Sequence, residues 1–309
     1  MWSSAGNAIW RKGTVARCFP NVSTPRFSII IQTYNRPRQL GQCLESVTRL
    51  DYPREGFEIL VVDDGGTADL GPVIEASGAR LLRQANQGPA AARNTGAGEA
   101  RGDFLAFTDD DCRPGRNWLR ALERPLEANP EALAGGATIN GLIENPYATA
   151  SQMLCDHIMG YYHSRRHPLR FFTTNNLAVA AGPFRQRGGF SVSFRMAASE
   201  DRELCDRWLG LGGEMIYALE AKVWHYHEMG LGEFLRQHYD YGRGALHFRR
   251  VRRHRTKEPI RLERPDFYLR MVVSPFQSRP AGKAAVLASL LVLSQAASAA
   301  GFLHEGITR

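Results

Sequence analysis

Cysteine is scarce in this sequence of 309 residues, and its distribution excludes a fold built on disulfides. None of the five cysteines forms a C-x-x-C pair, and an odd, scattered set argues against both a disulfide framework and a structural zinc site. We therefore expect a reducing compartment. The cysteines are Cys18, Cys43, Cys112, Cys155 and Cys205.

Two further absences narrow the class of protein. The first fourteen residues contain no long apolar run, so they do not read as a secretory signal. No G-x-G-x-x-G follows the first expected strand, so a dinucleotide site of the Rossmann type has no support. Hydrophobic residues nevertheless make up 43% of the chain, enough for a folded core rather than a disordered chain.

Positive charge is concentrated near the C-terminus. The net charge is +8, and the stretch from Arg236 to Arg270 holds eleven Lys or Arg against four Asp or Glu, a local balance of +7. Such a block serves nucleic acid, anionic lipid or an anionic substrate, or it is a solvated helical face. No helix-turn-helix or RNP signature accompanies it, so we expect no nucleic acid partner.

The chain divides into three parts by composition. Residues 1–25 show no period and are expected to be an N-terminal extension, residues 26–235 a main domain, and residues 236–309 a basic, helical region. Within the last part, Ala284–Phe302 is nineteen residues without a charge, at the lower limit for a membrane span. A buried or interfacial helix explains this segment equally well, so the prediction is a cytoplasmic protein, either peripheral to or anchored at the inner face of the cell membrane.

The sequence of the main domain predicts an α/β fold with an open, mostly parallel sheet and flanking helices. Short apolar runs begin at Phe27, Phe57 and Phe104, and segments with helical spacing separate them. Ligands of such sheets collect at the carboxyl ends of the strands. This expectation places residues 32–35, 63–64 and 109–111 along one edge.

Aspartates and histidines at expected strand ends are the first candidates for chemistry. On an extended chain Asp109 and Asp111 would point the same way and could hold one hard divalent cation such as Mg²⁺. Asp63 closes another strand and is either part of a turn or functional. His225 and His227 would share a strand face, where they are either structural residues or reach a metal.

A second acidic pair stands at the start of an expected helix. Glu200 and Asp201 follow Ser199, and acidic residues there are favoured by the helix dipole and by N-terminal capping. The alternative is that one of them is a general base, which takes a proton from an acceptor hydroxyl.

Taken in order, several segments resemble glycosyltransferase family 2 over about residues 26–245. They are FSIIIQTYNR (27–36), EILVVDDGG (58–66), NQGPAAARNTG (86–96), GDFLAFTDDD (102–111), GGF (188–190) and SEDREL (199–204). The resemblance implies the GT-A fold, with a Rossmann-like nucleotide-binding half, and a catalytic domain at residues 26–235. Gln32 stands where this family commonly has proline.

The resemblance also implies roles for individual residues. A nucleotide-sugar site is implied for Gln32, Thr33, Tyr34, Asn35, Asp63, Arg93, Asn94 and Asp110. Asp109-x-Asp111 matches a D-x-D motif for Mg²⁺ or Mn²⁺, and His225 and His227 are further candidate ligands. Asp201 matches the catalytic base, with Glu200 beside it.

The activity implied is transfer of a sugar from a nucleotide-diphosphate-sugar donor to an acceptor hydroxyl, with inversion at the anomeric carbon. The expected acceptor is a glycan or a lipid-linked molecule, in cell-surface polysaccharide or glycoconjugate synthesis, with an anionic membrane surface as a further partner. Two alternatives stay open. One is an inactive nucleotide-sugar-binding homologue, and the other is a nucleic-acid-binding protein that uses the Arg-rich block.

Overall fold

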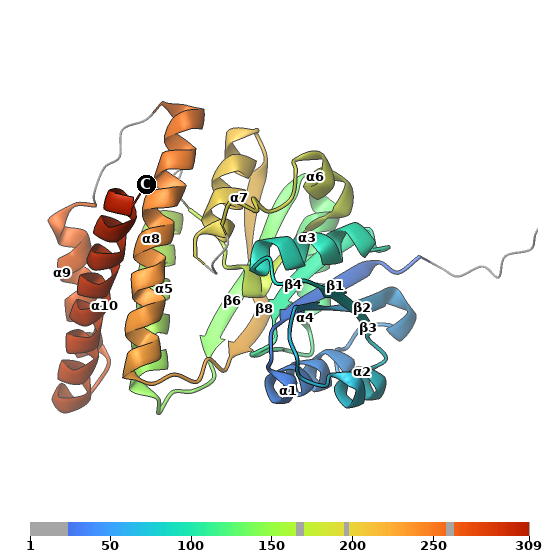
Figure 1. The fold of residues 1–309 in the computed structure, drawn as a ribbon, viewed down its shortest axis with the longest axis horizontal. Helices are drawn as coiled ribbons and strands as arrows, with labels where there is room; N and C mark the ends of the chain where they lie inside the picture. Colours follow the sequence, from blue (N-terminus) through green and yellow to red (C-terminus); the bar gives the residue numbers. More distant parts are fainter. Residues whose placement is uncertain (1–23, 165–169, 195–197, 258–262, 309) are drawn as a thin grey trace, which may run out of the picture.

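A central sheet with helices on both faces, and a further group of helices at one end, make up the computed structural model (Figure 1). The structure describes residues 24–164, 170–194, 198–257 and 263–308. Most of the expected N-terminal extension, with Cys18, lies outside the described residues. The other four cysteines are free thiols.

The first half of the chain forms the parallel part of the sheet, as its alternating apolar runs and helical segments predict. Strands and helices alternate along it, and the four strands pair in parallel in the order β3-β2-β1-β4. The elements are β1 (Phe27–Thr33), α1 (Pro37–Thr48), β2 (Phe57–Asp64), α2 (Gly71–Ser77), β3 (Arg80–Gln84), α3 (Pro89–Glu99) and β4 (Phe104–Asp109).

Burial on both faces explains why these strands are continuous apolar runs. On β1, Ile29 and Ile31 pack on one face with residues of α1 and α4 (Trp118–Ala128), whereas Ile30 packs on the other with residues of α3. All three isoleucines are fully buried.

The second half turns the sheet into a mixed one of eight strands, in the order β3-β2-β1-β4-β7-β6-β8-β5. Strand β7 is antiparallel to both β4 and β6, and β5 is antiparallel to β8. The 19-residue helix α5 has no counterpart among the sequence expectations. The elements are β5 (Cys112–Pro114), β6 (Ala132–Asn140), α5 (Pro146–Ser164), β7 (Leu177–Ala180), α6 (Ala181–Gln186), α7 (Glu200–Gly210) and β8 (Glu214–His225).

Three C-terminal helices stack against α5 rather than extend away from the domain (Figure 1). They are α8 (Leu231–Thr256), α9 (Pro265–Val273) and α10 (Ala281–Thr308). A boundary after residue 235 falls inside α8. By length and composition α10 is able to cross a membrane, but its buried face contacts α8 and α5.

A glycine on each of α8 and α10 allows the two helices to pack closely, and α8 is continuous through its own glycine. A Cβ at Gly242 would lie 1.9 Å from the backbone oxygen of Ser298 on α10. Gly301 of α10 makes the reciprocal approach, 1.9 Å from the backbone oxygen of Tyr239. The α8–α10 contact therefore requires glycine at both positions.

Acidic partners pair with three arginines of the Arg-rich block. The guanidinium of Arg252 lies 2.8 Å from Asp206 of α7, and Arg255 pairs with both Glu203 and Asp206. Arg243 lies 3.1 Å from Glu305 of α10. These three arginines fasten α8 to α7 and α10.

Candidate functional site

Strand register brings the expected functional segments to one edge of the sheet. Thr33 of β1 is paired with Asp63 of β2, and Gln32 is paired with Asp109 of β4. The ends of β1, β2 and β4 therefore lie side by side, as the parallel arrangement predicts.

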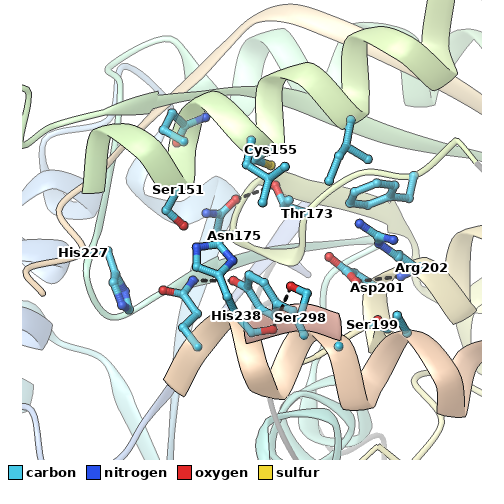
Figure 2. Close-up of a pocket in the computed structure, with 18 of the residues that line it drawn as sticks. Ser151, Cys155, Thr173, Asn175, Ser199, Asp201, Arg202, His227, His238 and Ser298 are labelled. Atoms are coloured by element: carbon cyan, nitrogen blue, oxygen red, sulfur yellow. Dashed lines mark hydrogen bonds between the residues drawn. The ribbon is translucent and has the colours of Figure 1, made fainter. Parts of the chain in front are cut away.

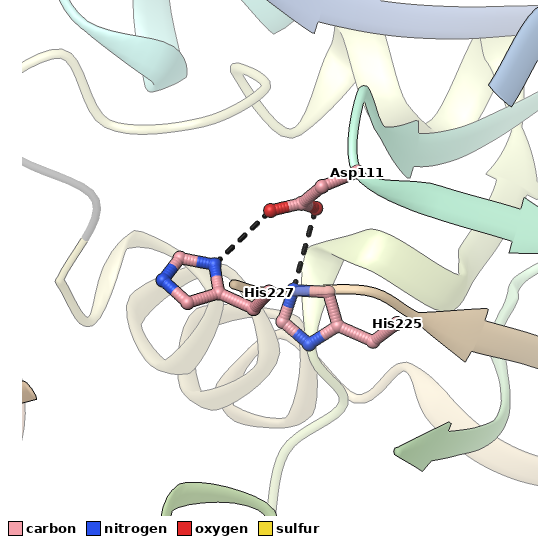
Figure 3. Close-up of side chains that lie close together, drawn as sticks. All are labelled: Asp111, His225 and His227. Carbon is pink, nitrogen blue, oxygen red and sulfur yellow. Dashed lines mark hydrogen bonds and ion pairs between the residues drawn. The ribbon is translucent and has the colours of Figure 1, made fainter. Parts of the chain in front are cut away.

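Asp111 faces two histidines that are more than a hundred residues away in sequence (Figure 3). Its carboxylate oxygens lie 3.3 Å from Nε2 of His225 and 3.0 Å from Nδ1 of His227. The pairing of β5 with β8 sets Cys112 opposite His225 and so creates this contact. The three groups place one ligand atom each within 4.8 Å of one another, which suits a divalent cation.

Opposite charges dominate the electrostatics of this cluster. Burial would raise the pKa of Asp111, but His225 and His227 hold that pKa well below its ordinary range. Burial works against charge on His225 as well, yet the Asp111 carboxylate raises the pKa of that imidazole. Arg36 adds a permanent positive charge, with Nη1 3.3 Å from Asp111. Asp111 is thus held as a carboxylate, the form that binds cations.

Asp110 contacts the end of β1. Its carboxylate accepts a hydrogen bond of 2.7 Å from the Thr33 hydroxyl and lies 3.3 Å from Arg36. Burial and the neighbouring Asp111 raise the pKa of Asp110 to about 7. Asp110 therefore organises the loop after β1.

Asp109 does not join the Asp111 cluster. Strand β4 ends at Asp109 and the next two residues form a turn, so the expectation of one extended strand through Asp111 is wrong. The Asp109 carboxylate instead lies 2.8 Å from Arg93, whose other nitrogen lies 2.9 Å from Glu200. Arg93 is 2% exposed, so a buried cation links the β4 end to the start of α7.

Glu200 and Asp201 open α7 without the capping contact that the sequence allows. Ser199 is in the left-handed region at φ +73°, and its side chain makes no cap hydrogen bond. Burial raises the pKa of both carboxyls above their ordinary values, although Arg93 opposes this for Glu200. The Asp201 side chain accepts a hydrogen bond of 2.7 Å from the Arg202 backbone.

Other expected nucleotide-site residues hold loops at this edge. Asn35, at φ +54°, accepts hydrogen bonds from the backbone of Thr67 and Ala68, and Asp63 accepts one from Gly66. Tyr34 is 50% exposed beside them.

Asn94 is also engaged with backbone. Its side chain forms two hydrogen bonds with the Phe190 backbone, at 2.8 and 2.9 Å, and so fixes the Gly188–Phe190 loop.

A cavity of about 750 Å³ opens directly onto the acidic pair and the histidines. Figure 2 shows His227 and Asp201 at its sides, with Ser151 and Cys155 on one wall and His238 on the other. Those two walls belong to α5 and α8.

Sequence reasoning misses several residues of this site. Arg36 contacts Asp110 and Asp111, but a single arginine before a proline carries no signal of that role. His238 lies in the Arg-rich stretch, and nothing in the sequence around it marks it as part of a site.

Comparison with known proteins identifies the family of this chain. Residues 28–198 match the family described as glycosyl transferase family 2, which is more than half of the chain, and the protein belongs to that family. Glycosyltransferase AglE of Haloferax volcanii is 36% identical over 118 residues, which cover 36% of this chain and 39% of AglE. The pre-mycofactocin glycosyltransferase of Mycobacterium tuberculosis is 28% identical over 236 residues, 73% of this chain and 47% of the relative. The chain thus spans less than half the length of these relatives.

Solved structures show that the fold is GT-A. The mannosyltransferase PcManGT from Pyrobaculum calidifontis, in complex with GDP-Man and Mn²⁺, aligns with a TM-score of 0.62 at 15% identity, over 92% of this chain and 88% of that one. GalNAc-T7, with UDP, GalNAc and Mn²⁺, aligns with a TM-score of 0.53 at 14% identity, over 91% and 56%. At these identities the likeness establishes the fold alone.

Proposed function

We propose that this protein transfers a glycosyl group from a nucleotide-diphosphate sugar to an acceptor hydroxyl, with inversion. The observation that carries the proposal is one cavity lined by both the Asp111-facing histidines and the Glu200–Asp201 pair. The histidines and the acidic pair could thus stabilise the leaving group and remove a proton from substrates bound in the same cavity.

The donor would bind at the carboxyl edge of β1, β2 and β4. Asp63 and Asn35 shape the loop at which the nucleoside would lie, and Arg36 stands where a diphosphate would meet a cation. Both aligned structures hold a nucleotide or a nucleotide sugar.

The residues that fit a metal are Asp111, His225 and His227. Two imidazole nitrogens disfavour Mg²⁺, which prefers oxygen ligands, so of the two ions expected we propose Mn²⁺. A bound Mn²⁺ would supply Lewis-acid stabilisation of the diphosphate leaving group. Asp109 lies outside this group because Arg93 holds it.

Asp201 is the proposed general base. As the acceptor oxygen bonds to the anomeric carbon and the bond from that carbon to the diphosphate breaks, the hydroxyl proton passes to Asp201. A raised pKa suits this role, because a base works best when its pKa is near the operating pH. A single displacement inverts the configuration.

Peripheral attachment to a membrane is the proposed location, through α9 and α10. The face of α10 opposite its buried face carries Val292 at 51% exposure, Leu303 at 65% and Ile307 at 87%. Leu269 of α9, at 65%, is exposed as well. Since α10 is fixed to α8 by close glycine contacts, we propose that it lies in the interface rather than spans the bilayer.

A thermal-shift screen of nucleoside diphosphates and nucleotide sugars, with Mn²⁺ or Mg²⁺, tests the donor site. Saturation at a hundred times Kd adds about 2.7 kcal/mol of stability. We expect a shift with at least one nucleotide in Mn²⁺, reduced in Asp111→Asn. A screen without any shift in either ion would contradict the proposed function.

A further inference from the structure

The cavity beside the acidic pair is long, and three helices line it. Residues 237–249 of α8 form one wall, and at 1.5 Å per residue they extend over about 18 Å. Residues 148–158 of α5 form the opposite wall, and residues 295–303 of α10 close a third side. The space therefore continues well beyond what a donor sugar at the sheet edge would occupy.

Most of the surface that lines the cavity is apolar. Arg249 marks one end, where its guanidinium lies 5.6 Å from the Phe302 ring centre. Leu303 lines the cavity and is also 65% exposed, so the cavity adjoins the exposed apolar face of α10. The larger apolar side chains of the lining are Leu154, Ile158, Phe171, Met229, Phe302 and Leu303.

Polar groups without partners lie in these same walls. His238 is 1% exposed, and both of its ring nitrogens lack a hydrogen-bond partner. Oε1 of Gln237 and Nη1 of Arg249 are also buried and unpartnered. An unsatisfied buried polar atom is unfavourable, and a ligand that supplies its partner relieves that penalty.

The position and the protonation state of His238 suit it to form a hydrogen bond with a ligand hydroxyl. Its ring is held between Phe234 and Tyr241, with ring centres 4.4 and 5.6 Å away. Burial lowers the pKa of His238 to about 4, so the imidazole is neutral near pH 7 and offers one donor and one acceptor. A ligand hydroxyl can satisfy either nitrogen.

We propose that this cavity is the acceptor site, and that the acceptor is an amphiphile with a hydroxyl-bearing head and an apolar body. The inference rests on the proposed transfer reaction. The head lies at Asp201 and His238, and the body lies between α5, α8 and α10. Acceptors would enter from the exposed apolar face at Leu303, where a membrane would present them.

Binding of a simple amphiphile to the full chain tests the inference. The probes are n-octyl β-D-glucoside below its micelle concentration, glucose and maltotetraose, measured by calorimetry with Mn²⁺ and a nucleoside diphosphate present. We expect saturable binding of the octyl glucoside, at least tenfold tighter than glucose or maltotetraose. Equal or tighter binding of maltotetraose would overturn the amphiphile assignment in favour of a glycan.

Two variants and one matched control locate the binding. Ser151→Trp fills the cavity from α5 and should weaken octyl glucoside binding at least tenfold, whereas Ser289→Trp, on the exposed face of α10, should leave it unchanged. His238→Phe keeps the ring but removes both nitrogens, and should weaken binding about fivefold or more. Equal loss in Ser151→Trp and Ser289→Trp, or no loss in either cavity variant, would place binding elsewhere and overturn the proposal.

Nucleotide binding distinguishes failure of the acceptor inference from failure of the proposed function. A protein that binds a nucleoside diphosphate with Mn²⁺ but not octyl glucoside keeps its proposed function and loses the acceptor inference. A protein that binds no nucleotide loses both.

Discussion

Arg93 offers a sharp test of the site because a single buried cation serves two carboxylates. Its guanidinium is 2% exposed and lies 2.8 Å from Asp109 and 2.9 Å from Glu200. Arg93→Met would keep much of the volume and leave Glu200, 4% exposed, without its cation. Breaking a buried ion pair from one side typically costs about 3–5 kcal/mol.

The protonation state of Glu200 decides how much unfolding free energy the variant loses within that range. Burial already raises the pKa of Glu200, so in the variant this carboxyl can escape the penalty by taking up a proton. We therefore expect a loss of about 3 kcal/mol at neutral pH, smaller at pH 5 and larger at pH 8, in urea unfolding of the metal-free protein.

Arg101→Met is the matched control. Arg101 lies 3.1 Å from Glu58 but is 61% exposed, so its removal should lower the unfolding free energy by less than about 1 kcal/mol. In the double variant with Glu200→Gln, Arg93→Met should cost at least about 1 kcal/mol less than it does alone. If Arg93→Met costs no more than Arg101→Met, the reasoning about the buried pair is refuted.

Three other predictions concern the C-terminal helices. Gly242→Ala forces α8 and α10 apart and should lower the unfolding free energy by about 1–3 kcal/mol, whereas Gly232→Ala, with open space around it on the same helix, should not destabilise; similar unfolding curves for the two would refute the close contact. Folding lowers the pKa of His238 from 6.5 to about 4, so its contribution to the unfolding free energy is intact above pH 6.5, and about 2–3 kcal/mol of that free energy is lost as the pH falls to 4.5. His238→Phe should abolish this part of the acid sensitivity, and an unchanged dependence of the unfolding free energy on pH would count against the reasoning. Leu293→Glu, on the exposed face of α10, should reduce flotation with vesicles of anionic lipid, and wild-type protein that ignores such vesicles at low salt would remove the membrane proposal.

The parallel half of the fold was predictable because each strand is apolar on both faces. Runs such as residues 27–31 leave no polar residue for a solvent face except Ser28, whose hydroxyl donates to Glu58. Helix α5 was not predictable in the same way. It packs its neighbours on one side and lines a cavity with Ser151 and Cys155 on the other, which blurs the apolar stripe that marks a helix.

The candidate site was predictable in its residue types but not in its partnerships. Strand ends located Asp109 and Asp111, yet a turn after Asp109 sends the two carboxylates to different partners. The contact of Asp111 with His225 depends on the pairing of β5, which is only three residues long, with β8. Three residues are too few to show a hydrophobic pattern that would predict the partner strand.

Transfer by an Asp201→Asn variant tests the account most directly. Purified protein with Mn²⁺, the nucleotide sugar identified by the thermal screen and octyl glucoside is assayed for release of nucleoside diphosphate, and donor affinity is measured on the same folded sample. General-base catalysis typically contributes ~10²–10⁴-fold, so we expect turnover to fall by at least about a hundredfold with donor affinity little changed. A near wild-type rate in Asp201→Asn would contradict the assignment of the base.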